Sequence, residues 1–216
     1  MVEKSTSDRA KDRNWTQFYQ ATAGRPPRPT LLRALAAVRR GPPGRRALDL
    51  GCGTGRDTLP LLAAGWHVLA IDAEAEALDR LAERVPRAWR PRLTIRAARL
   101  EATSLPAAEL VNASFSLFFT DNQAVPADLL RRIHAALVPG GQFAGHLLGP
   151  RDSWVGSGRA IGCDRRLLRH WLAGFELASL LEEEDDSVTP MGEAKHWHIW
   201  HINARKAALR DFSKRR

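Results

Sequence analysis

The sequence has few of the residues that would mark a secreted or membrane-spanning protein. Among 216 residues there are only two cysteines, Cys52 and Cys163, too few for a disulfide framework. No run approaches the roughly twenty apolar residues that a membrane-spanning helix needs. The polar start, MVEKSTSDRAKDRN, lacks the apolar core of a secretory signal. These absences predict a cytoplasmic protein with reduced thiols and no membrane partner.

Lysine is also scarce, although the chain carries a net charge of +9. It stands only at positions 4, 11, 195, 206 and 214, and arginine is scattered along the chain. Surfaces that bind nucleic acid concentrate these cations, because clustered positive charge releases counterions from phosphates. The absence of a basic stripe argues against a nucleic-acid partner. The charge alone leaves an RNA-directed activity open as an alternative.

The remaining composition suits one domain. With 216 residues and 44% hydrophobic content, the chain can bury a core without disulfides or metal. No internal repeat or long linker divides it. We therefore expect a single domain over residues 1–206, with N-terminal lid helices over 15–40, a sheet core over 46–206 and a basic tail over 207–216. The composition does not indicate an oligomeric state.

Short apolar runs alternate with segments of helical spacing along most of the chain. RALDL ends in a glycine cluster, as expected for a buried parallel strand that leads into a tight turn. A helix is expected from Asp57 to Ala64, and HVLAID follows as a second buried strand. Further strands are expected in RLTIRAA, ELVNASFSLFF and QFAGHLL, with helices over 74–84 and 126–137 and a PGG turn at 139–141. This alternation predicts a parallel sheet with helices on both faces.

The last third of the chain has a different pattern. After a helix near 165–172, FELASLLEEEDD and KHWHIWHINARK indicate two strands joined by an acidic turn at Glu182 to Asp186. Strands joined by a short turn pair antiparallel. The sequence therefore predicts an α/β fold with a doubly wound, mostly parallel, seven-stranded sheet and a C-terminal antiparallel hairpin.

The residues that carry chemistry are concentrated in DLGCGTGRD, residues 49–57, directly after the first strand. Ligands of open α/β sheets bind at the carboxyl ends of strands. Glycines at 51, 53 and 55 let the backbone turn sharply and approach a ligand closely. Asp72 ends the second strand, where an acid commonly accepts hydrogen bonds from an adenosine ribose. The pattern predicts a site for an adenosine-containing ligand.

Two other nucleotide-binding loops fit the spacing poorly. The dinucleotide fingerprint GxGxxG needs its third glycine at position 56, which is occupied by Arg56. A phosphate-binding P-loop needs GK[ST], which does not follow here. The spacing therefore disfavours both NAD and a nucleoside triphosphate.

DLGCGTG after one strand, with Asp72 after the next, resembles motif I of class I S-adenosylmethionine (SAM)-dependent methyltransferases. PGG before QFAGHLL resembles the turn before their fifth strand, and the resemblance covers roughly residues 15–206. The GRDT continuation and the N-terminal lead-in are most similar to the TehB-like (tellurite-resistance) and thiopurine-methyltransferase-like group. The resemblance implies a Rossmann-like fold, SAM as cofactor, and methyl transfer to a small-molecule acceptor.

The resemblance also implies a set of cofactor-binding residues. The three glycines would face the methionine part of SAM, Asp72 the ribose, and Leu100 and Glu101 the adenine. Arg99 departs from the family pattern, because an Asp is usual there. The residues expected to bind the cofactor are Tyr19, Arg28, Gly51, Cys52, Gly53, Thr54, Gly55, Asp57, Asp72, Ala73, Leu100, Glu101 and Asn112.

The acceptor site is expected beyond the fourth and fifth strands. NASF at 112–115 differs from the [DN]PP[YF] motif of base-amine methyltransferases, which disfavours a nucleobase acceptor. The residues expected to bind the acceptor are Trp15, Phe118, Arg151, Trp154 and His196. His146, following the fifth strand, is the candidate general base, although a buried histidine bonded to the backbone is the alternative.

Three further expectations concern the ends of the chain and the type of activity. Trp15 to Arg28 combines aromatics and arginines with stiffening prolines, which predicts a lid over the pocket. His196 and His198 share one strand face and His201 the other, a spacing that favours a structural hairpin without metal. A SAM-binding regulator without turnover stays open as an alternative, since function resides in the site and not in the fold.

Overall fold

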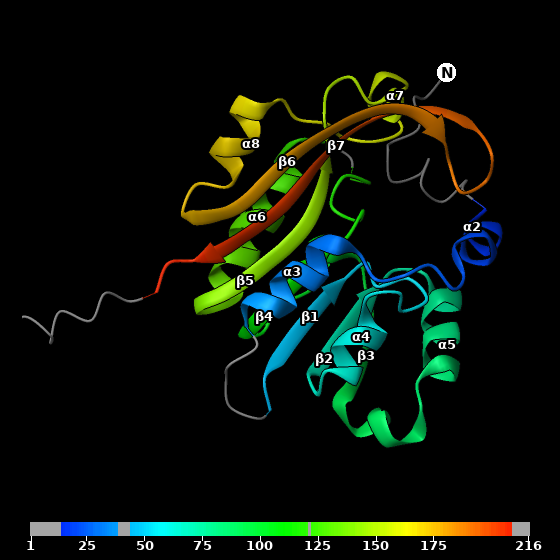
Figure 1. Ribbon diagram of the computed structural model, residues 1–216, viewed down its shortest axis with the longest axis vertical. Coiled ribbons are helices and arrows are strands. Elements are labelled where there is room, and N and C mark those ends of the chain that lie inside the picture. The colour runs from blue at the N-terminus through cyan, green and yellow to red at the C-terminus, as the bar shows by residue number, and fades with distance from the viewer. Residues whose placement is uncertain (1–13, 39–43, 121, 209–216) are drawn as a thin grey trace, which may run out of the picture.

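A sheet of seven strands forms the centre of the protein (Figure 1). The computed structural model describes residues 14–38, 44–120 and 122–208. The strands are β1 (Arg46–Leu50), β2 (His67–Asp72), β3 (Leu93–Ala97), β4 (Ala108–Ala113), β5 (Leu137–Leu148), β6 (Phe175–Val188) and β7 (Ala194–Lys206). Their order is β3-β2-β1-β4-β5-β7-β6. Neighbours from β3 to β5 are parallel, and β7 is antiparallel to both β5 and β6. The predicted fold class is therefore confirmed.

Helices cover both faces of this sheet, as a doubly wound fold requires. The helices are α2 (Trp15–Thr22), α3 (Pro29–Ala37), α4 (Thr58–Ala63), α5 (Ala75–Arg84), α6 (Ala124–Ala136), α7 (Ser153–Gly156) and α8 (Arg165–Trp171), with 3₁₀ helices η1 (Arg87–Arg92) and η2 (Leu100–Ala102). Helices α3, α4 and α5 bury one set of apolar side chains against the sheet, and α6 and α8 bury another (Figure 1).

Apolar side chains on the sheet-facing sides of the helices make these two cores. On one face Leu31, Leu61 and Leu81 are fully buried, and on the other Leu130 and Leu168 are fully buried. Each such leucine contributes about 1.5 to 3 kcal/mol through the apolar surface it removes from water. The cores hold the strands rigidly, so that the carboxyl ends of β1, β2 and β4 present their loops at one edge of the sheet.

The acidic run Glu182 to Asp186 lies inside β6, so the predicted acidic turn is wrong. The chain reverses at 189–193, where the amide of Thr189 donates to the carbonyl of Glu193 at 2.8 Å. Successive side chains of a strand point to opposite faces. Glu182 accordingly pairs with Arg165, whereas Glu183 bonds to His201. Because the acidic side chains have partners on both faces of β6, this acidic segment can remain an extended strand.

Two other boundaries differ from the sequence prediction. Pro139 to Gly141, expected as a turn, belongs to β5 itself, and the pairing with β4 shifts register between Ala108 and Leu110. The fourth strand ends at Ala113, and residues 114–120 form a loop. This loop carries Phe115 and Phe118 towards the hairpin.

The described residues contain no helix with the length and apolar character needed to span a membrane. Positions 39–40 of the expected lid region and 209–216 of the expected basic tail lie outside the described residues.

Candidate functional site

The glycine loop after β1 contains three left-handed glycines that serve different purposes. Gly51, Gly53 and Gly55 have φ of 69°, 51° and 86°. A Cβ on Gly51 would lie 2.3 Å from the Cβ of Ser116, and one on Gly55 would lie 2.4 Å from Cδ1 of Leu81. A Cβ on Gly53 would meet only Tyr19, at 3.9 Å. Gly51 and Gly55 therefore allow close packing within the protein, and Gly53 leaves room for a ligand.

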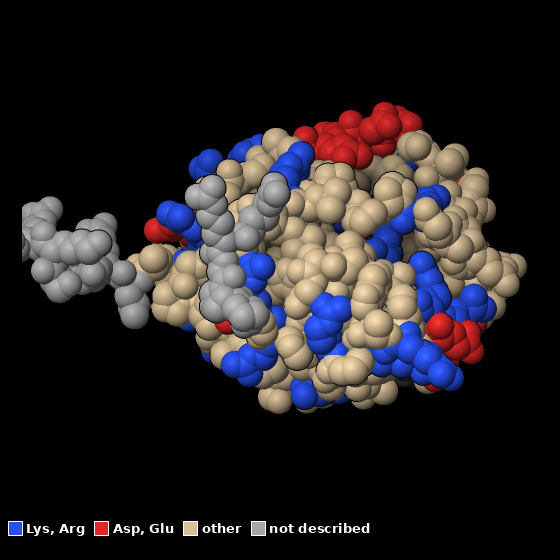
Figure 2. All heavy atoms as spheres, turned by 60° about the horizontal axis from the view of Figure 1, so that its bottom comes forward, with Lys and Arg blue, Asp and Glu red and all other residues tan. Residues whose placement is uncertain are grey.

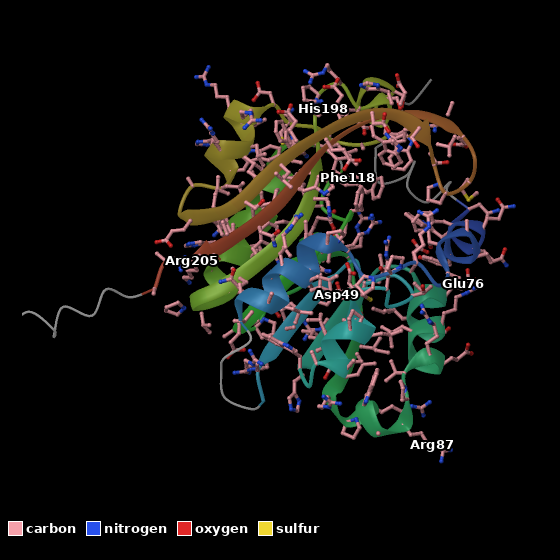
Figure 3. All side chains as sticks on the ribbon, viewed as in Figure 1. Asp49, Glu76, Arg87, Phe118, His198 and Arg205 are labelled. Atoms are coloured by element: carbon pink, nitrogen blue, oxygen red, sulfur yellow. The ribbon has the colours of Figure 1, made fainter. Side chains whose placement is uncertain are left out.

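A cavity of about 1030 Å³ lies between this loop, α2 and the β6–β7 hairpin. It includes the carboxyl ends of β1 and β2, where an open α/β sheet binds its ligands. Asp49 lies at the end of β1, and Phe118 lies farther towards the hairpin (Figure 3). Pockets that bind one small molecule have volumes from roughly 300 Å³ upwards. The volume of this cavity is therefore sufficient for two ligands side by side.

Most of the predicted site residues line this cavity. From the expected cofactor set these are Tyr19, Arg28, Gly51, Cys52, Gly53, Thr54, Asp57, Asp72, Ala73, Leu100 and Glu101, and from the expected acceptor set Trp15, Phe118 and Trp154. Gly55, Asn112, Arg151, His196 and His146 are not among the lining residues. Gly55 packs against α5 instead, which explains its absence from the cavity wall.

Asp72 links the glycine loop to the end of β2. Its Oδ2 accepts from the Gly53 amide at 2.8 Å, and its Oδ1 accepts from the Glu74 amide at 3.0 Å. Burial raises the pKa of Asp72, and these backbone hydrogen bonds oppose the rise. A carboxylate oxygen has more than one lone pair, so Asp72 can still accept hydrogen bonds from a ligand hydroxyl.

Asp49 is the centre of a buried polar network beneath the loop. The Thr58 hydroxyl donates to Oδ2 of Asp49 at 2.6 Å, and the Asn112 amide donates to Oδ1 at 2.8 Å and to Oδ2 of Asp57 at 3.2 Å. Burial and the neighbouring Asp57 raise the pKa of Asp49 to about 7. Asn112 therefore bridges two carboxylates and does not itself line the cavity, so a contact between Asn112 and the cofactor stays a prediction.

The raised pKa of Asp49 makes a pH-dependent contribution to stability. From its usual value of 3.8 up to about 7, the folded protein holds a proton that the unfolded chain has lost. The contribution of Asp49 to the unfolding free energy therefore falls as pH rises through this window. Asp49→Asn cannot ionise, so its stability relative to the natural protein is expected to be higher at about pH 8 than at about pH 5.

Urea unfolding at both pH values measures this difference. Asp128→Asn, at an exposed ion pair on α6, is the matched control and should show a smaller pH-dependent change. An equal stability difference between Asp49→Asn and the natural protein at the two pH values would contradict a raised pKa.

Helix α2 covers the cavity with its aromatic side chains. Asn14 caps the helix by accepting from the Gln17 amide at 3.0 Å. Tyr19 is 4% exposed, and its ring is stacked with the ring of Trp15, with centroids 6.1 Å apart. Burial, with the charges of Asp72 and Glu74, raises the pKa of Tyr19, so it stays a neutral phenol. Cε1 of the Tyr19 ring lies 3.9 Å from the position that a Cβ on Gly53 would take.

Arg28 joins the lid segment to the loops below it. Its amide donates to Oδ1 of Asp57 at 3.0 Å, and its guanidinium lies 4.2 Å from the centre of the Phe115 ring. Burial, together with repulsion from Arg56, lowers the pKa of Arg28 to about 10, so it remains a cation. It therefore places a positive charge in the cavity wall.

Phe115 is a non-glycine residue at positive φ, 57°. This conformation is uncommon for a bulky side chain and costs on the order of 1 kcal/mol or more. Its ring stacks on that of His146, with centroids 4.3 Å apart. The strained backbone thus turns the ring between Arg28 on one side and His146 on the other.

His146 lies within β5 and is 1% exposed, so its predicted place after the strand is wrong. Its Nδ1 is buried without a hydrogen-bond partner, so this nitrogen makes no bond to the backbone. Burial, followed by the nearby charges of His201 and Arg28, lowers its pKa well below the usual value. A neutral ring behind Phe115 is poorly placed for proton transfer in the cavity.

A buried ion pair supports the acceptor end of the cavity. Lys195 and Asp152 pair with side chains that are 1% and 0% exposed. The Lys195 ammonium lies 4.2 Å from the ring centres of both Trp154 and Trp197. These two tryptophans line the cavity, so the ion pair sets the position of an aromatic wall.

Arg151 and His196 lie on the outer face of the hairpin. Arg151 pairs with Glu184, and His196 bonds to Asp186 and Glu184 at 2.7 and 3.1 Å. His198, on the same strand face as His196, bonds to Glu182 at 2.9 Å and lies away from Asp49 (Figure 3). In the described part of the chain, no three His, Cys, Asp or Glu side chains form a group that could hold a metal. The absence of metal stays a prediction.

The inner face of the hairpin adds cavity residues that the sequence interpretation missed. Glu183, Trp197 and His201 line the cavity. The two-residue period of a strand places Trp197, Ile199 and His201 on one face, so the grouping was readable from the sequence. The sequence does not predict which face of β7 lines the cavity, because this depends on how the hairpin curves over the loops.

The fold and the site together define a class of protein. The antiparallel β7 between β5 and β6, the glycine loop after β1 and the acid ending β2 are the architecture of class I methyltransferases. The family model described as a methyltransferase domain matches residues 47–141, which include the loop, Asp72 and Asn112. Residues 47–141 therefore match a methyltransferase domain, and the fold is that of the class I methyltransferases.

Several known proteins are similar to parts of the chain. It is 31% identical over 98 residues to a magnesium-protoporphyrin O-methyltransferase from Rhodobacter capsulatus, covering 44% of each chain. The solved structure of TehB from Haemophilus influenzae has a TM-score of 0.67 and 14% identity over 89% of this chain and 67% of that one. Synechocystis magnesium protoporphyrin IX methyltransferase (ChlM) with bound SAM has a TM-score of 0.68 and 13% identity over 96% and 100%. The structural likenesses show the fold alone, and the chain spans less than half the length of its curated relative.

Proposed function

We propose that the protein is a SAM-dependent methyltransferase that acts on a small-molecule acceptor. The observation that carries the proposal is the open position above Gly53, beside the Asp72 carboxylate, in a cavity roofed by Tyr19. The backbone of the glycine loop can approach the methionine part of SAM, the Asp72 carboxylate can accept hydrogen bonds from its ribose, and the Tyr19 ring can cover its sulfonium. The match of residues 47–141 to a methyltransferase domain supports the same assignment.

The lining residues divide between the two proposed ligands. The cofactor would be held by the glycine loop, by Asp72 and Ala73, and by Leu100 and Glu101, with Tyr19 and Arg28 above it. When bound, SAM supplies an activated methyl group on a sulfonium. A cation of this kind is favoured by an aromatic face, which Tyr19 offers. The remaining task of the protein is to align the acceptor with that methyl group, and such positioning accounts for much of the catalysis.

The acceptor half of the cavity favours a small, partly aromatic molecule. Trp15, Phe118, Phe119 and Trp154 provide apolar walls there. An RNA-directed activity has less support, because Lys and Arg are spread over the face in view without forming one continuous stripe (Figure 2). A SAM-binding regulator without turnover would share the cofactor half of the site. The single-domain organisation and a cytoplasmic location stay predictions.

Isothermal titration calorimetry tests the proposal. SAM is expected to bind and NADH is not, because Arg56 occupies the position of the third dinucleotide glycine. Asp72→Ala should weaken SAM by about 1 to 3 kcal/mol, the cost of leaving ligand hydroxyls without an acceptor. Asp79→Ala, an exposed residue of α5, is the matched control. Tight NADH binding without SAM binding would overturn the assignment, and unchanged SAM affinity in Asp72→Ala would remove Asp72 from the site.

A further inference from the structure

A histidine–glutamate pair stands in the wall of the acceptor half of the cavity. Nε2 of His201 on β7 lies 2.7 Å from Oε2 of Glu183 on β6. Both residues line the cavity, and their side chains are 20% and 54% exposed. The other histidines of the hairpin differ: His196 and His198 bond to acids on the outer face and do not line the cavity.

The glutamate determines which nitrogen of His201 can take a proton. A carboxylate accepts the hydrogen on Nε2, so the neutral imidazole carries its lone pair on Nδ1. Among the described residues, none bonds to this Nδ1. A base oriented by a carboxylate, with its other nitrogen unoccupied, is the arrangement that general-base catalysis uses.

Groups from three neighbouring segments face His201. From β6, Glu183 bonds to Nε2 and fixes the orientation of the ring. From β5, His146 meets His201 edge-on at 5.0 Å between ring centroids, and its lowered pKa keeps it from competing for the proton. From the segment before α3, the Arg28 cation opposes a second positive charge, but its amide and its guanidinium face are held by Asp57 and Phe115.

We propose that His201, oriented by Glu183, is the general base of the reaction and accepts the proton of an acceptor whose nucleophile is a hydroxyl or amine. This inference rests on the proposed methyltransferase function. The nucleophile forms a bond to the methyl carbon, the carbon–sulfur bond breaks with its electron pair left on sulfur, and the O–H or N–H proton passes to Nδ1 of His201. The products are the methylated acceptor, S-adenosylhomocysteine and a protonated His201.

The residues that line the cavity also restrict the kind of acceptor molecule that can carry this nucleophile. Trp197 lies on the same strand face as His201, and its ring is 5.4 Å from that of Trp154 and 6.3 Å from that of Phe115. Flat apolar rings of this kind pack best against another aromatic ring. The acceptor class is therefore an aromatic hydroxyl or amine with a proton to lose.

The first part of the test uses the protein without turnover. Calorimetry with SAM is run on the natural protein and each variant, so that a failure of the proposed function is seen separately as absent SAM binding. Histidine ring ¹⁵N NMR on the S-adenosylhomocysteine complex then reports the tautomer. His201 is expected to carry its neutral-state proton on Nε2 and to lose this preference in Glu183→Gln. A neutral His201 protonated on Nδ1 in the natural protein would overturn the proposal.

The second part measures turnover with catechol, 4-nitrophenol, benzylamine and tryptamine, against N,N-dimethylaniline as an acceptor without a proton to lose. His201→Asn should lower kcat about 10²- to 10⁴-fold with little change in KM and abolish the acidic limb of the rate profile. Glu183→Gln should also lower kcat with little change in KM, because the carboxylate that orients the ring is gone. His170→Asn and Glu176→Gln, exposed residues of α8 and β6, are the matched controls.

Three outcomes would overturn the proposal in a protein that binds SAM. These are His201→Asn turnover within about threefold of the natural rate, methylation of the aprotic probe alone, and no methylation of any protic probe. If His201→Asn does not fold, the exposed Glu183→Gln variant decides the matter through the lowered kcat and the altered tautomer.

Discussion

Lys195→Met is expected to destabilise the folded protein by about 3 to 5 kcal/mol, the usual cost of removing one partner of a buried ion pair. The Asp152 side chain is 0% exposed, and without the ammonium its donors in the described part of the chain are the amides of Trp154 and His198, at 2.9 and 3.2 Å. A buried carboxylate with incomplete compensation is strongly unfavourable. Methionine preserves the length of the lysine side chain, so the effect reports the charge more than the packing.

Urea unfolding monitored by circular dichroism measures the loss. Arg205→Met is the matched control on the same hairpin, because its pair with Glu176 has side chains 56% and 48% exposed. Such exposed pairs contribute about 0 to 1 kcal/mol. The double variant Lys195→Met with Asp152→Asn should recover part of the loss, since no unpaired carboxylate remains. A loss below about 1 kcal/mol in Lys195→Met would show that the pair does not hold the aromatic wall.

The fold was predictable because its signals are local. The central parallel strands β1, β2 and β4 are mostly buried on both faces and are therefore apolar runs, and the longer helices show their own apolar periodicity. RALDL and HVLAID are such runs, and both are strands within the predicted boundaries. The hairpin strands were also found, but the acidic run was assigned to their turn. Consecutive acids resemble a solvated turn unless their partners on the neighbouring strand and helix are known.

The part of the candidate site that lies in one short segment of sequence was predictable. The glycine loop and Asp72 are joined by the hydrogen bond from the Gly53 amide, and both follow from motif spacing. Asn112 and Gly55 were expected at the cofactor from their place near the motif but do not line the cavity, because Asn112 bonds to two carboxylates and Gly55 packs against Leu81.

The acceptor side was the least predictable part. Arg151 and His196 were expected in the cavity and lie on the outer face, whereas His201 was set aside and lines the cavity. A two-residue period assigns side chains to two faces, but the curvature of the long β6–β7 hairpin decides which face meets the ligand. The position of the hairpin is also tied to residues far apart in sequence, as the pair of Lys195 with Asp152 shows.

Deleting residues 1–24 is expected to leave the sheet folded while SAM affinity falls at least about tenfold, equivalent to about 1.4 kcal/mol, and turnover is lost. Helix α2 has one buried side chain, Tyr19, whereas α3 anchors itself with Thr30, Leu31 and Ala34, so the core does not depend on α2. The deletion stops before Arg28 because the Arg28 amide bonds to Asp57. The lost function is that of a lid, which excludes water and strengthens the polar contacts that align the ligands.

The matched deletion removes residues 1–13 and keeps Asn14, whose side chain caps α2 through the Gln17 amide. This shorter deletion should retain SAM affinity and turnover. The hydroxyl of Thr16 also bonds to Glu76 on α5 at 2.6 Å, so the lid is docked at both its first turn and Tyr19. Circular dichroism and urea unfolding confirm that both deletion proteins are folded before calorimetry is compared. A folded 25–216 protein that binds SAM as tightly as the full chain and turns over its acceptor at the same rate would mean that α2 is not a functional lid.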